Sequence, residues 1–533
     1  MYSVFTGKAK GFANYKTFLM AVLMLWVATS CNKTPQHAKH IPKQASAVVA
    51  IDTKKLAWDI ISFDDIFGKN TDTTSDETGK KLQEAGIDFL STSYVFSTGA
   101  LDKAPVSALL PLSDAAKFKA FLETFDKEHP LVVKEENGFR VAGNNDFVVM
   151  FDDKLAIVAT LKNYGEAQLK THANTLFTLA EENSLAESNT YFKGLLEHGG
   201  ALSFWVSLKD AMPSEATANN PAADQTNKAL TGRFMTATLD FEKGKAVLKS
   251  DFYSENEADK EYGKLLSQPI NKDLLADVPS DKPMGVVALK LDVPLLRKLM
   301  QKVGVSMQVE GGLTMAGVSP DDFFGMLSGD VIVAATEAAA EMNGTPQVFV
   351  NLGISNNETC NKVLGILSSQ SFIKKENDYF VGGGVVPAIY SLIPRDKKLM
   401  FASSAKMRDL IVGNKAPKFK AEVGENAMYF LLDFDVFTQQ MSQFATDYSR
   451  LANKYVKSFE ATAIQKSEKQ SEAVFSLHTK PENESSWKAL AEYGQEVKKL
   501  DEAQRKQWQM EEQEIIEADT ASVAVPLEEE PVQ

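Results

Sequence analysis

Two serine–lysine pairs have residue types and a spacing that could support a reaction. Ser403 with Lys406, and Ser485 with Lys488, show the Ser-x-x-Lys spacing, which puts a lysine amine one helical turn from a hydroxyl. An amine at that place could take the hydroxyl proton and make the serine a nucleophile. The motifs Ser-Asp-Asn and Lys-Thr-Gly, which accompany such a pair in enzymes, do not occur in the chain. The sequence therefore predicts no catalytic serine.

The histidines do not form a metal-ligand pattern. None stands one helical turn from another on a plausible helix with a third ligand near, and there is no Cys-x-x-Cys pair. His37 and His40 precede the first apolar segment and are expected to be solvated. We predict neither a metal nor another cofactor. The histidines are His37, His40, His129, His172, His198 and His478.

Glycine and aspartate motifs favour structural roles. The glycines at 382, 383 and 384 lack the lysine and hydroxyl residue of a phosphate-binding loop, so they predict a turn or bulge. Adjacent aspartates point to opposite faces of a strand, or diverge by about 100° on a helix, and cannot easily act as an acid–base pair. We interpret three such pairs as turns or caps: Asp64 with Asp65, Asp152 with Asp153, and Asp321 with Asp322.

The first thirty residues have the pattern of an export signal that ends at a cysteine. Lys8, Lys10 and Lys16 precede an apolar run at residues 18–28, which is shorter than the roughly 20 residues needed to span a bilayer. This order is typical of a secretory signal peptide. Small residues then lead into Cys31, and the sequence resembles the bacterial lipobox, in which the cysteine is acylated and becomes the first residue.

We predict that residues 1–30 are removed and that Cys31 carries palmitate or a related acyl chain. Two or more acyl chains give stable membrane attachment, since each buried CH2 contributes roughly 0.8 kcal/mol. An ordinary signal peptide stays open as an alternative, because Ala28 stands where Leu or Val is usual. With Cys31 acylated, Cys360 has no disulfide partner, and its amphipathic segment predicts a buried small residue.

The charge of the chain excludes one class of partner. The formal net charge is −14, and the signal segment contains lysines and no acid, so the mature protein is more negative still. Nucleic-acid binding depends on clustered Lys and Arg, so we predict no nucleic acid as partner. Anionic headgroups also repel an acidic surface, and the membrane contact is expected through the lipid on Cys31.

Internal sequence matches at a nearly constant offset predict a tandem duplication. "IPKQASAVVAIDTKKLAWDI" from Ile41 matches "VPSDKPMGVVALKLDVPLLRKL" from Val278, and "VKEENGF" from Val133 matches "IKKENDY" from Ile373, each about 240 residues later. Other strand and helix segments match in the same order. The chain therefore reads as two similar halves.

Short strands separated by turns, with helices interspersed among them, predict an α+β fold. A tether at residues 31–40 is expected to lead into a first repeat at 41–270 and a second at 275–497. Each repeat is expected to hold a mostly antiparallel sheet covered by helices. Asp292 stands where the N-cap of a helix belongs.

Residues 498–533 are predicted as an exposed helix followed by an acidic, disordered tail. From Glu511 onward there are eight acids and no base, which is typical of a segment that cannot bury enough apolar surface to fold. "DTA" at positions 519–521 resembles a short O-glycan acceptor pattern of exported Bacteroidetes proteins. Thr520 is therefore a candidate for glycosylation.

Three features together resemble a family of Bacteroidetes lipoproteins that carry a domain of unknown function. They are the lipobox, "HIPKQASAVVAID" after it, and "GMLSGDVIVAAT" further on. The resemblance covers nearly the whole mature chain. It implies a compartment and a fold, and it supplies no catalytic residue.

We predict a non-enzymatic envelope lipoprotein that serves as a binding or scaffold module. Surface export in such bacteria resembles a rule that needs acids soon after the lipidated cysteine, and here none occurs between Cys31 and Asp52. We therefore expect an outer-membrane protein that faces the periplasm, with envelope proteins or wall material as partners and an open oligomeric state. The alternatives are a hydrolase built from distant residues and a carrier of an apolar ligand.

Overall fold

The computed structural model describes residues 36–53, 55, 84–100, 103–125, 131–161, 165–212, 230–256, 259, 263–339, 345–383, 387, 390–441 and 446–522. The chain forms two compact units. Unit 1 contains residues 1–54 and 80–219, and unit 2 contains residues 55–79 and 220–533. Cys31, together with Asp64 and Asp65, lies outside the described residues.

Unit 1 is built on an antiparallel sheet whose strands pair in the order β8–β1–β2–β3–β7–β6–β5–β4. Buried and half-buried side chains alternate along β1 and β8, as expected of strands with one face on a core. The strands are β1 (Ala47–Ile51), β2 (Ser93–Ser97), β3 (Val106–Pro111), β4 (Lys134–Glu136), β5 (Phe139–Gly143), β6 (Phe147–Phe151), β7 (Leu155–Thr160) and β8 (Leu202–Ser207).

Helices pack on this sheet through large aromatic side chains. Phe118 of α4 meets Phe151 of β6 edge to face at 5.1 Å between ring centroids, and Phe192 of α7 meets Trp205 of β8 at 6.1 Å. The Asn189 side chain caps α7 by accepting a hydrogen bond from the Phe192 amide (2.9 Å). The helices are η1 (Gln36–His40), α4 (Ala115–Phe125), α5 (Glu166–Phe177), η2 (Glu181–Asn183), α6 (Leu185–Ser188) and α7 (Thr190–Glu197).

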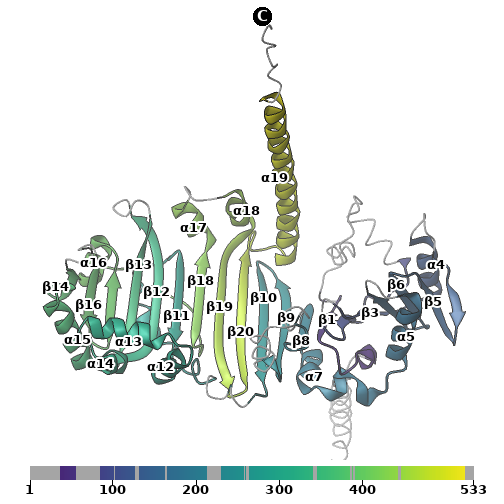
Figure 1. Ribbon diagram of the computed structural model, residues 1–533, viewed down its shortest axis with the longest axis horizontal. Helices are drawn as coiled ribbons and strands as arrows, with labels where there is room; N and C mark the ends of the chain where they lie inside the picture. Colours follow the sequence, from purple (N-terminus) through teal and green to yellow (C-terminus); the bar gives the residue numbers. More distant parts are fainter. Residues whose placement is uncertain are drawn as a thin grey trace, which may run out of the picture. The chain divides into compact units, whose positions relative to one another are not determined.

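Unit 2 is built on a longer antiparallel sheet, shown in Figure 1, with the order β9–β10–β20–β19–β18–β11–β12–β13–β17–β16–β15–β14. The strands are β9 (Arg233–Glu242), β10 (Lys245–Ser254), β11 (Gly285–Lys290), β12 (Leu327–Ala339), β13 (Thr345–Ile354), β14 (Ile373–Glu376), β15 (Tyr379–Gly382), β16 (Ser391–Arg395), β17 (Lys398–Ala402), β18 (Met428–Asp433), β19 (Val456–Ser467) and β20 (Gln470–Thr479).

Two apolar cores lie on opposite faces of the unit 2 sheet. On β17, Met400 belongs to the core that includes α11 and α16, and its neighbour Leu399 belongs to the core that includes α15. The expected N-cap Asp292 is confirmed, since its carboxylate accepts from the Leu295 amide at 2.9 Å. The helices are α11 (Lys272–Leu275), α12 (Val293–Lys302), α13 (Ser306–Met315), α14 (Pro320–Met326), α15 (Asn357–Ser369), α16 (Ala405–Val412), α17 (Phe434–Gln440), α18 (Asp447–Tyr455) and α19 (Ser486–Ser522).

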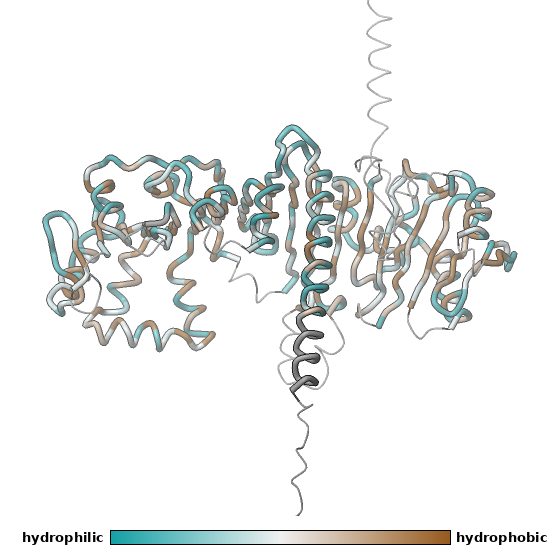
Figure 2. Tube along the Cα trace, turned by 90° about the horizontal axis from the view of Figure 1, so that it is seen from above, coloured by the Kyte–Doolittle hydropathy of each residue, from teal (hydrophilic) through white to brown (hydrophobic). Residues whose placement is uncertain are grey.

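The long helix α19 extends away from the unit 2 sheet (Figure 1). Its base is held by α18, where Lys454 pairs with Glu496 at 2.7 Å and the Tyr448 hydroxyl donates to Asp501. Figure 2 colours most of the described part of α19 as hydrophilic, and it shows hydrophobic residues along the strands. The helical backbone continues to Ser522, so the candidate glycosylation residue Thr520 lies within α19.

The α+β class with antiparallel sheets is confirmed. The order of β8–β1–β2–β3–β7–β6–β5–β4 in unit 1 recurs as β18–β11–β12–β13–β17–β16–β15–β14 in unit 2. The matched residues Ile41 and Val278 are both fully buried. Asn137 and Asn377 both have a positive φ, +53° and +51°. The hairpin β9–β10 pairs with β20 and so lies in unit 2, although the sequence match places it at the end of the first repeat.

Candidate functional site

The Ser403 and Lys406 side chains serve the fold. The buried Ser403 hydroxyl accepts a hydrogen bond from the Val348 amide at 2.8 Å, which ties the end of β17 to β13. Lys406 is exposed and pairs with Glu337. The second candidate lysine, Lys488, pairs with Glu484 at 3.0 Å. Each of the two lysine amines is therefore paired with a carboxylate.

The expected turns and caps are also found where they are described. Asp152 accepts from the backbone amides of Lys154 (2.7 Å) and Leu155 (2.8 Å) in the β6–β7 hairpin. Asp321 and Asp322 lie in the first turn of α14, where negative charge is favourable. Asp152 thus fixes local backbone, whereas Asp321 and Asp322 pair with Arg297 and Lys362.

The expectation that His40 is solvated is wrong. Its ring packs on Phe177 at 5.9 Å between centroids, and Nδ1 lies 3.0 Å from the Leu176 carbonyl oxygen. The residue is buried, and burial lowers its pKa. The turn that carries it, η1, is part of the folded unit because Ala38 is fully buried. The sequence around His40 is short and polar, so it gave no sign of this contact with Leu176, which lies 136 residues away in the chain.

One serine–histidine contact in unit 1 was not anticipated from the sequence. Ser107 Oγ on β3 lies 3.0 Å from His172 Nε2 on α5. Burial lowers the pKa of His172, and among the described ion pairs none includes this histidine, so no carboxylate orients it as in a catalytic triad. Ser107 is itself buried. The contact joins helix to sheet and offers no access to a substrate.

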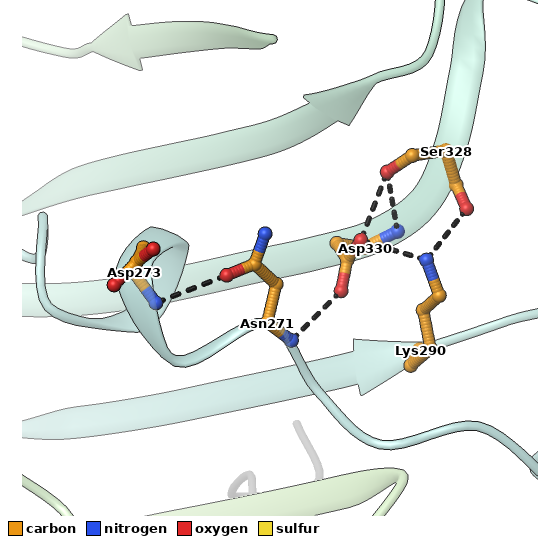
Figure 3. Close-up of polar contacts among 5 residues, drawn as sticks. All are labelled: Asn271, Asp273, Lys290, Ser328 and Asp330. Carbon is orange, nitrogen blue, oxygen red and sulfur yellow. Dashed lines mark hydrogen bonds and ion pairs between the residues drawn. The ribbon is translucent and has the colours of Figure 1, made fainter.

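A buried polar cluster in unit 2 is shown in Figure 3. The Asp330 carboxylate on β12 accepts hydrogen bonds from Lys290 Nζ (2.8 Å), Ser328 Oγ (2.9 Å) and the Asn271 amide (3.0 Å). Lys290 also donates to the Ser328 carbonyl at 2.8 Å. The Asn271 side chain in turn caps α11 by accepting from the Asp273 amide (3.0 Å). The ion pair is therefore almost enclosed, and both of its members make further hydrogen bonds, as a buried pair requires.

The other end of α11 is held by a second polar group. Fully buried Asn351 on β13 donates from Nδ2 to the Leu274 carbonyl (3.1 Å) and to Asp277 (3.2 Å). Lys398 on β17 pairs with the same Asp277 oxygen at 2.6 Å. The two groups fasten α11 to the face of the sheet.

Gly353 provides the space for this cluster. A Cβ atom at that position would lie 2.1 Å from Ser328 Oγ and 2.9 Å from Asp330 Cβ. Both carboxylate oxygens of Asp330 accept hydrogen bonds from within the cluster. We interpret the cluster as a structural fastening. In the part of the chain that the structure describes, no group of acidic, histidine or cysteine residues could hold a metal ion.

An apolar pocket lies between helices α13, α14 and α15 of unit 2. Its volume is about 380 Å³, at the lower end of the range for small-molecule sites. Among the described lining residues, Gln308 alone has a polar side chain. The floor belongs to the core that contains Cys360, which is buried as expected, and burial raises the pKa of its thiol. Among the lining residues are Val309, Gly312, Leu313, Phe323, Val363 and Leu367.

Helix α13 forms one wall of the pocket, and it is unusual because its apolar side chains are exposed. No residue of α13 is buried, and Met307 and Met315 are 84% and 89% exposed. Between Lys302 and Asp321 the sequence has only one charged residue, Glu310. Such a segment would be expected inside a core, so the sequence signalled apolar character but not its exposure.

Similarity searches identify the family without giving a function. Three crystal forms of TP0453 are similar at 8%, 9% and 8% identity, with TM-scores of 0.27, 0.26 and 0.25. They cover 42%, 43% and 44% of this chain and 82%, 81% and 88% of their own, and likeness at this level supports no inference. No curated protein matches. Within the described residues, no helix combines the length and apolar character needed to cross a bilayer. The model of the domain of unknown function DUF4836 matches residues 38–379, and the chain belongs to this family.

Proposed function

We propose that the protein is a non-enzymatic, lipid-anchored binding module of the bacterial envelope, similar to Bacteroidetes lipoproteins. The anchor is an acyl group on Cys31, attached after removal of residues 1–30, and the folded units face the periplasm from the outer membrane. The signal pattern and the lipobox-like order support the anchor. The lack of acids soon after Cys31 supports the periplasmic side.

The observation that carries the binding role is the apolar pocket and the exposed apolar helix α13 beside it. Water-exposed apolar side chains that gather in one place mark binding surfaces more often than isolated ones do. Val303, Val305, Met307, Val309 and Met315 are all exposed within one short stretch. By contrast, the polar groups considered as catalytic have structural partners, such as Ser403 with Val348.

The body of this module is proposed to have arisen by tandem duplication. The common order of strand pairing and the offset of about 240 residues between sequence matches support this view. The hairpin β9–β10, which extends the unit 2 sheet, would then have exchanged partners during the duplication.

Crosslinking in intact cells tests the binding role. A photoreactive amino acid in place of Met315 should give an adduct, because this exposed residue lies on α13 three residues from the lining residue Gly312. The matched control is the same amino acid in place of Lys119, an exposed position on α4 in unit 1. Equal adduct yields from the two positions would contradict the proposal.

The anchor and its side of the membrane are tested separately. Cys31→Ser should release the protein from membranes or stall its processing, since the thiol that receives the lipid is gone. Protease added to intact cells should leave the α19 end uncut, and protease after permeabilisation of the outer membrane should remove it. Cleavage in intact cells would place the protein on the cell surface.

A further inference from the structure

We propose that the pocket between α13, α14 and α15 binds the single unbranched chain of a fatty acid, with α13 as a movable wall. The inference rests on the proposed binding role and names the class of ligand. It requires three properties of the site: a size that fits one chain, a lining that offers it no charge, and a route by which the chain can enter.

The size and lining favour one alkyl chain. A volume of about 380 Å³ lies near the lower limit for small-molecule sites and leaves no room for a lipid with two chains. Phe323, Val363 and Leu367 supply an apolar floor, and of the lining residues that the structure describes only Gln308 could hydrogen bond through its side chain. A charged head group would therefore remain in water at the mouth, where its desolvation is avoided.

The exposed methionines beside the pocket suit a flexible ligand. Met307 and Met315 have unbranched, polarizable side chains that adapt to an irregular apolar surface. Met315 lies three residues from the lining residue Gly312, so its side chain can approach a chain that enters the pocket.

Glycines at both ends of α13 provide the route of entry. Gly304 and Gly317 have φ values of +80° and +74°, a conformation that favours glycine and can act as a hinge. No residue of α13 is fully buried, and Leu313 is its side chain packed against the core that contains Cys360. An ion pair also joins it to α12: Arg297 Nε donates to Glu310 at 2.9 Å, while the same guanidinium donates to Asp321 on α14 at 2.6 Å.

The test uses the full chain with Cys31→Ser, which leaves Cys360 as the one cysteine. Calorimetric titration with dodecanoate below its micelle concentration should give saturable binding, and butyrate should give none because it lacks the chain. In the pocket variant Gly312→Leu, the new side chain occupies the site, and affinity for dodecanoate should fall about tenfold or more. The Cβ at Gly312 itself meets nothing within 4 Å, so the fold should tolerate it.

Gly311→Leu is the matched control. It lies on the same helix, its Cβ also has open space, and it does not line the pocket. Dodecanoate should also slow the alkylation of Cys360, whose helical turn includes the lining residue Val363, in the parent and in Gly311→Leu but not in Gly312→Leu. Equal affinities of the two leucine variants, or equal binding of butyrate, would overturn the inference.

Two further outcomes separate this inference from the proposed function. A specific adduct at Met315 without dodecanoate binding would leave a binding module whose ligand is not a fatty acid. Binding of the parent chain to phosphatidylcholine vesicles, without any response to free dodecanoate, would show that α13 contacts a membrane surface and would also overturn the inference.

Discussion

The sheets of units 1 and 2 pair their strands in the same order but fill the centre differently. In unit 1, Tyr94 of β2 lies opposite Leu109 of β3, and both are fully buried. At the corresponding place in unit 2, Ile332 lies opposite the buried amide Asn351. One topology therefore accepts a tyrosine and a leucine at the centre of one unit, and an isoleucine and a hydrogen-bonded amide at the centre of the other.

The polar centre of unit 2 has a positional consequence. Apolar contacts have no preferred direction, whereas hydrogen bonds do. The Asn351 side-chain amide must point toward Leu274 and Asp277 to donate to them, and the Asn271 backbone amide must point toward the Asp330 carboxylate. These bonds set the position of α11 on the sheet. We infer that the buried polar groups stabilise unit 2 less than apolar side chains would, and that they fix the position of α11 on the sheet.

The largest expected effect comes from Asp330→Ala. Removing one partner of a buried pair leaves Lys290 charged and uncompensated, which costs about 3–5 kcal/mol of unfolding free energy. Hydrogen exchange should show the loss in β12 peptides and leave β2 peptides of unit 1 unchanged. The control is the double variant Lys290→Met with Asp330→Leu, which should lose less than Asp330→Ala. If the single and double variants lost the same unfolding free energy, the Lys290–Asp330 ion pair would not determine the stability of this part of unit 2.

A smaller effect is expected at Gly353, which makes room for the cluster. Alanine there would press on Ser328 Oγ and Asp330, and overpacking of this kind costs about 1–3 kcal/mol. Denaturant titration of Gly353→Ala should show this loss. Gly365→Ala on α15 is the control, since its Cβ meets nothing within 4 Å and alanine favours a helix. A Gly353→Ala protein as stable as the parent would mean that Ser328 and Asp330 can shift to accommodate the added methyl group.

Much of the local structure follows from the sequence. The Asp292 cap, the buried Cys360 and the strand hairpins depend on neighbours within a few residues, so their patterns are legible. The pairing of β9–β10 with β20 joins segments more than 200 residues apart, and no local pattern encodes it. The link from Lys398 to Asp277 spans 121 residues.

The candidate site was harder to predict for a similar reason. The apolar, glycine-containing sequence of α13 is compatible with a buried helix, and only the tertiary structure leaves Met307 and Met315 in water. In the sequence, Lys290 and Asp330 look like ordinary surface charges. In the fold they lie opposite each other on β11 and β12, and the Asn271 amide donates to Asp330. Burial depends on the whole fold, so spacing alone cannot supply it.

Acid should weaken unit 1 more than unit 2. Burial lowers the pKa of His37, His40 and His172 in unit 1, and of His478 in unit 2, below the usual 6.5. Above pH 6.5 this stability is fully present. As pH falls through 6.5 toward the lower folded pKa values, the unfolded chain binds protons first and the stability is lost.

Hydrogen exchange at pH 7 and at about pH 5.5, corrected for intrinsic rates, should therefore show a larger loss of protection in β2 than in β12. His172→Gln, which can still hydrogen bond to Ser107 but does not titrate in this range, should reduce the difference. A pH dependence that is the same in both units would contradict the assignment to these histidines.

The smallest effects are expected at the two hairpins that most directly test common ancestry of the units. Asn137 and Asn377 occupy the first position of the β4–β5 and β14–β15 turns, with φ values of +53° and +51°. Alanine disfavours this left-handed conformation, so each Asn→Ala change should cost about 1 kcal/mol. Asn→Gly at the same places should be close to neutral, because glycine adopts positive φ readily.

If the units descend from one ancestor, both alanine variants should lose stability, each seen by hydrogen exchange in its own hairpin. A loss confined to one hairpin would show that the shared φ is incidental there, and would weaken the case for duplication.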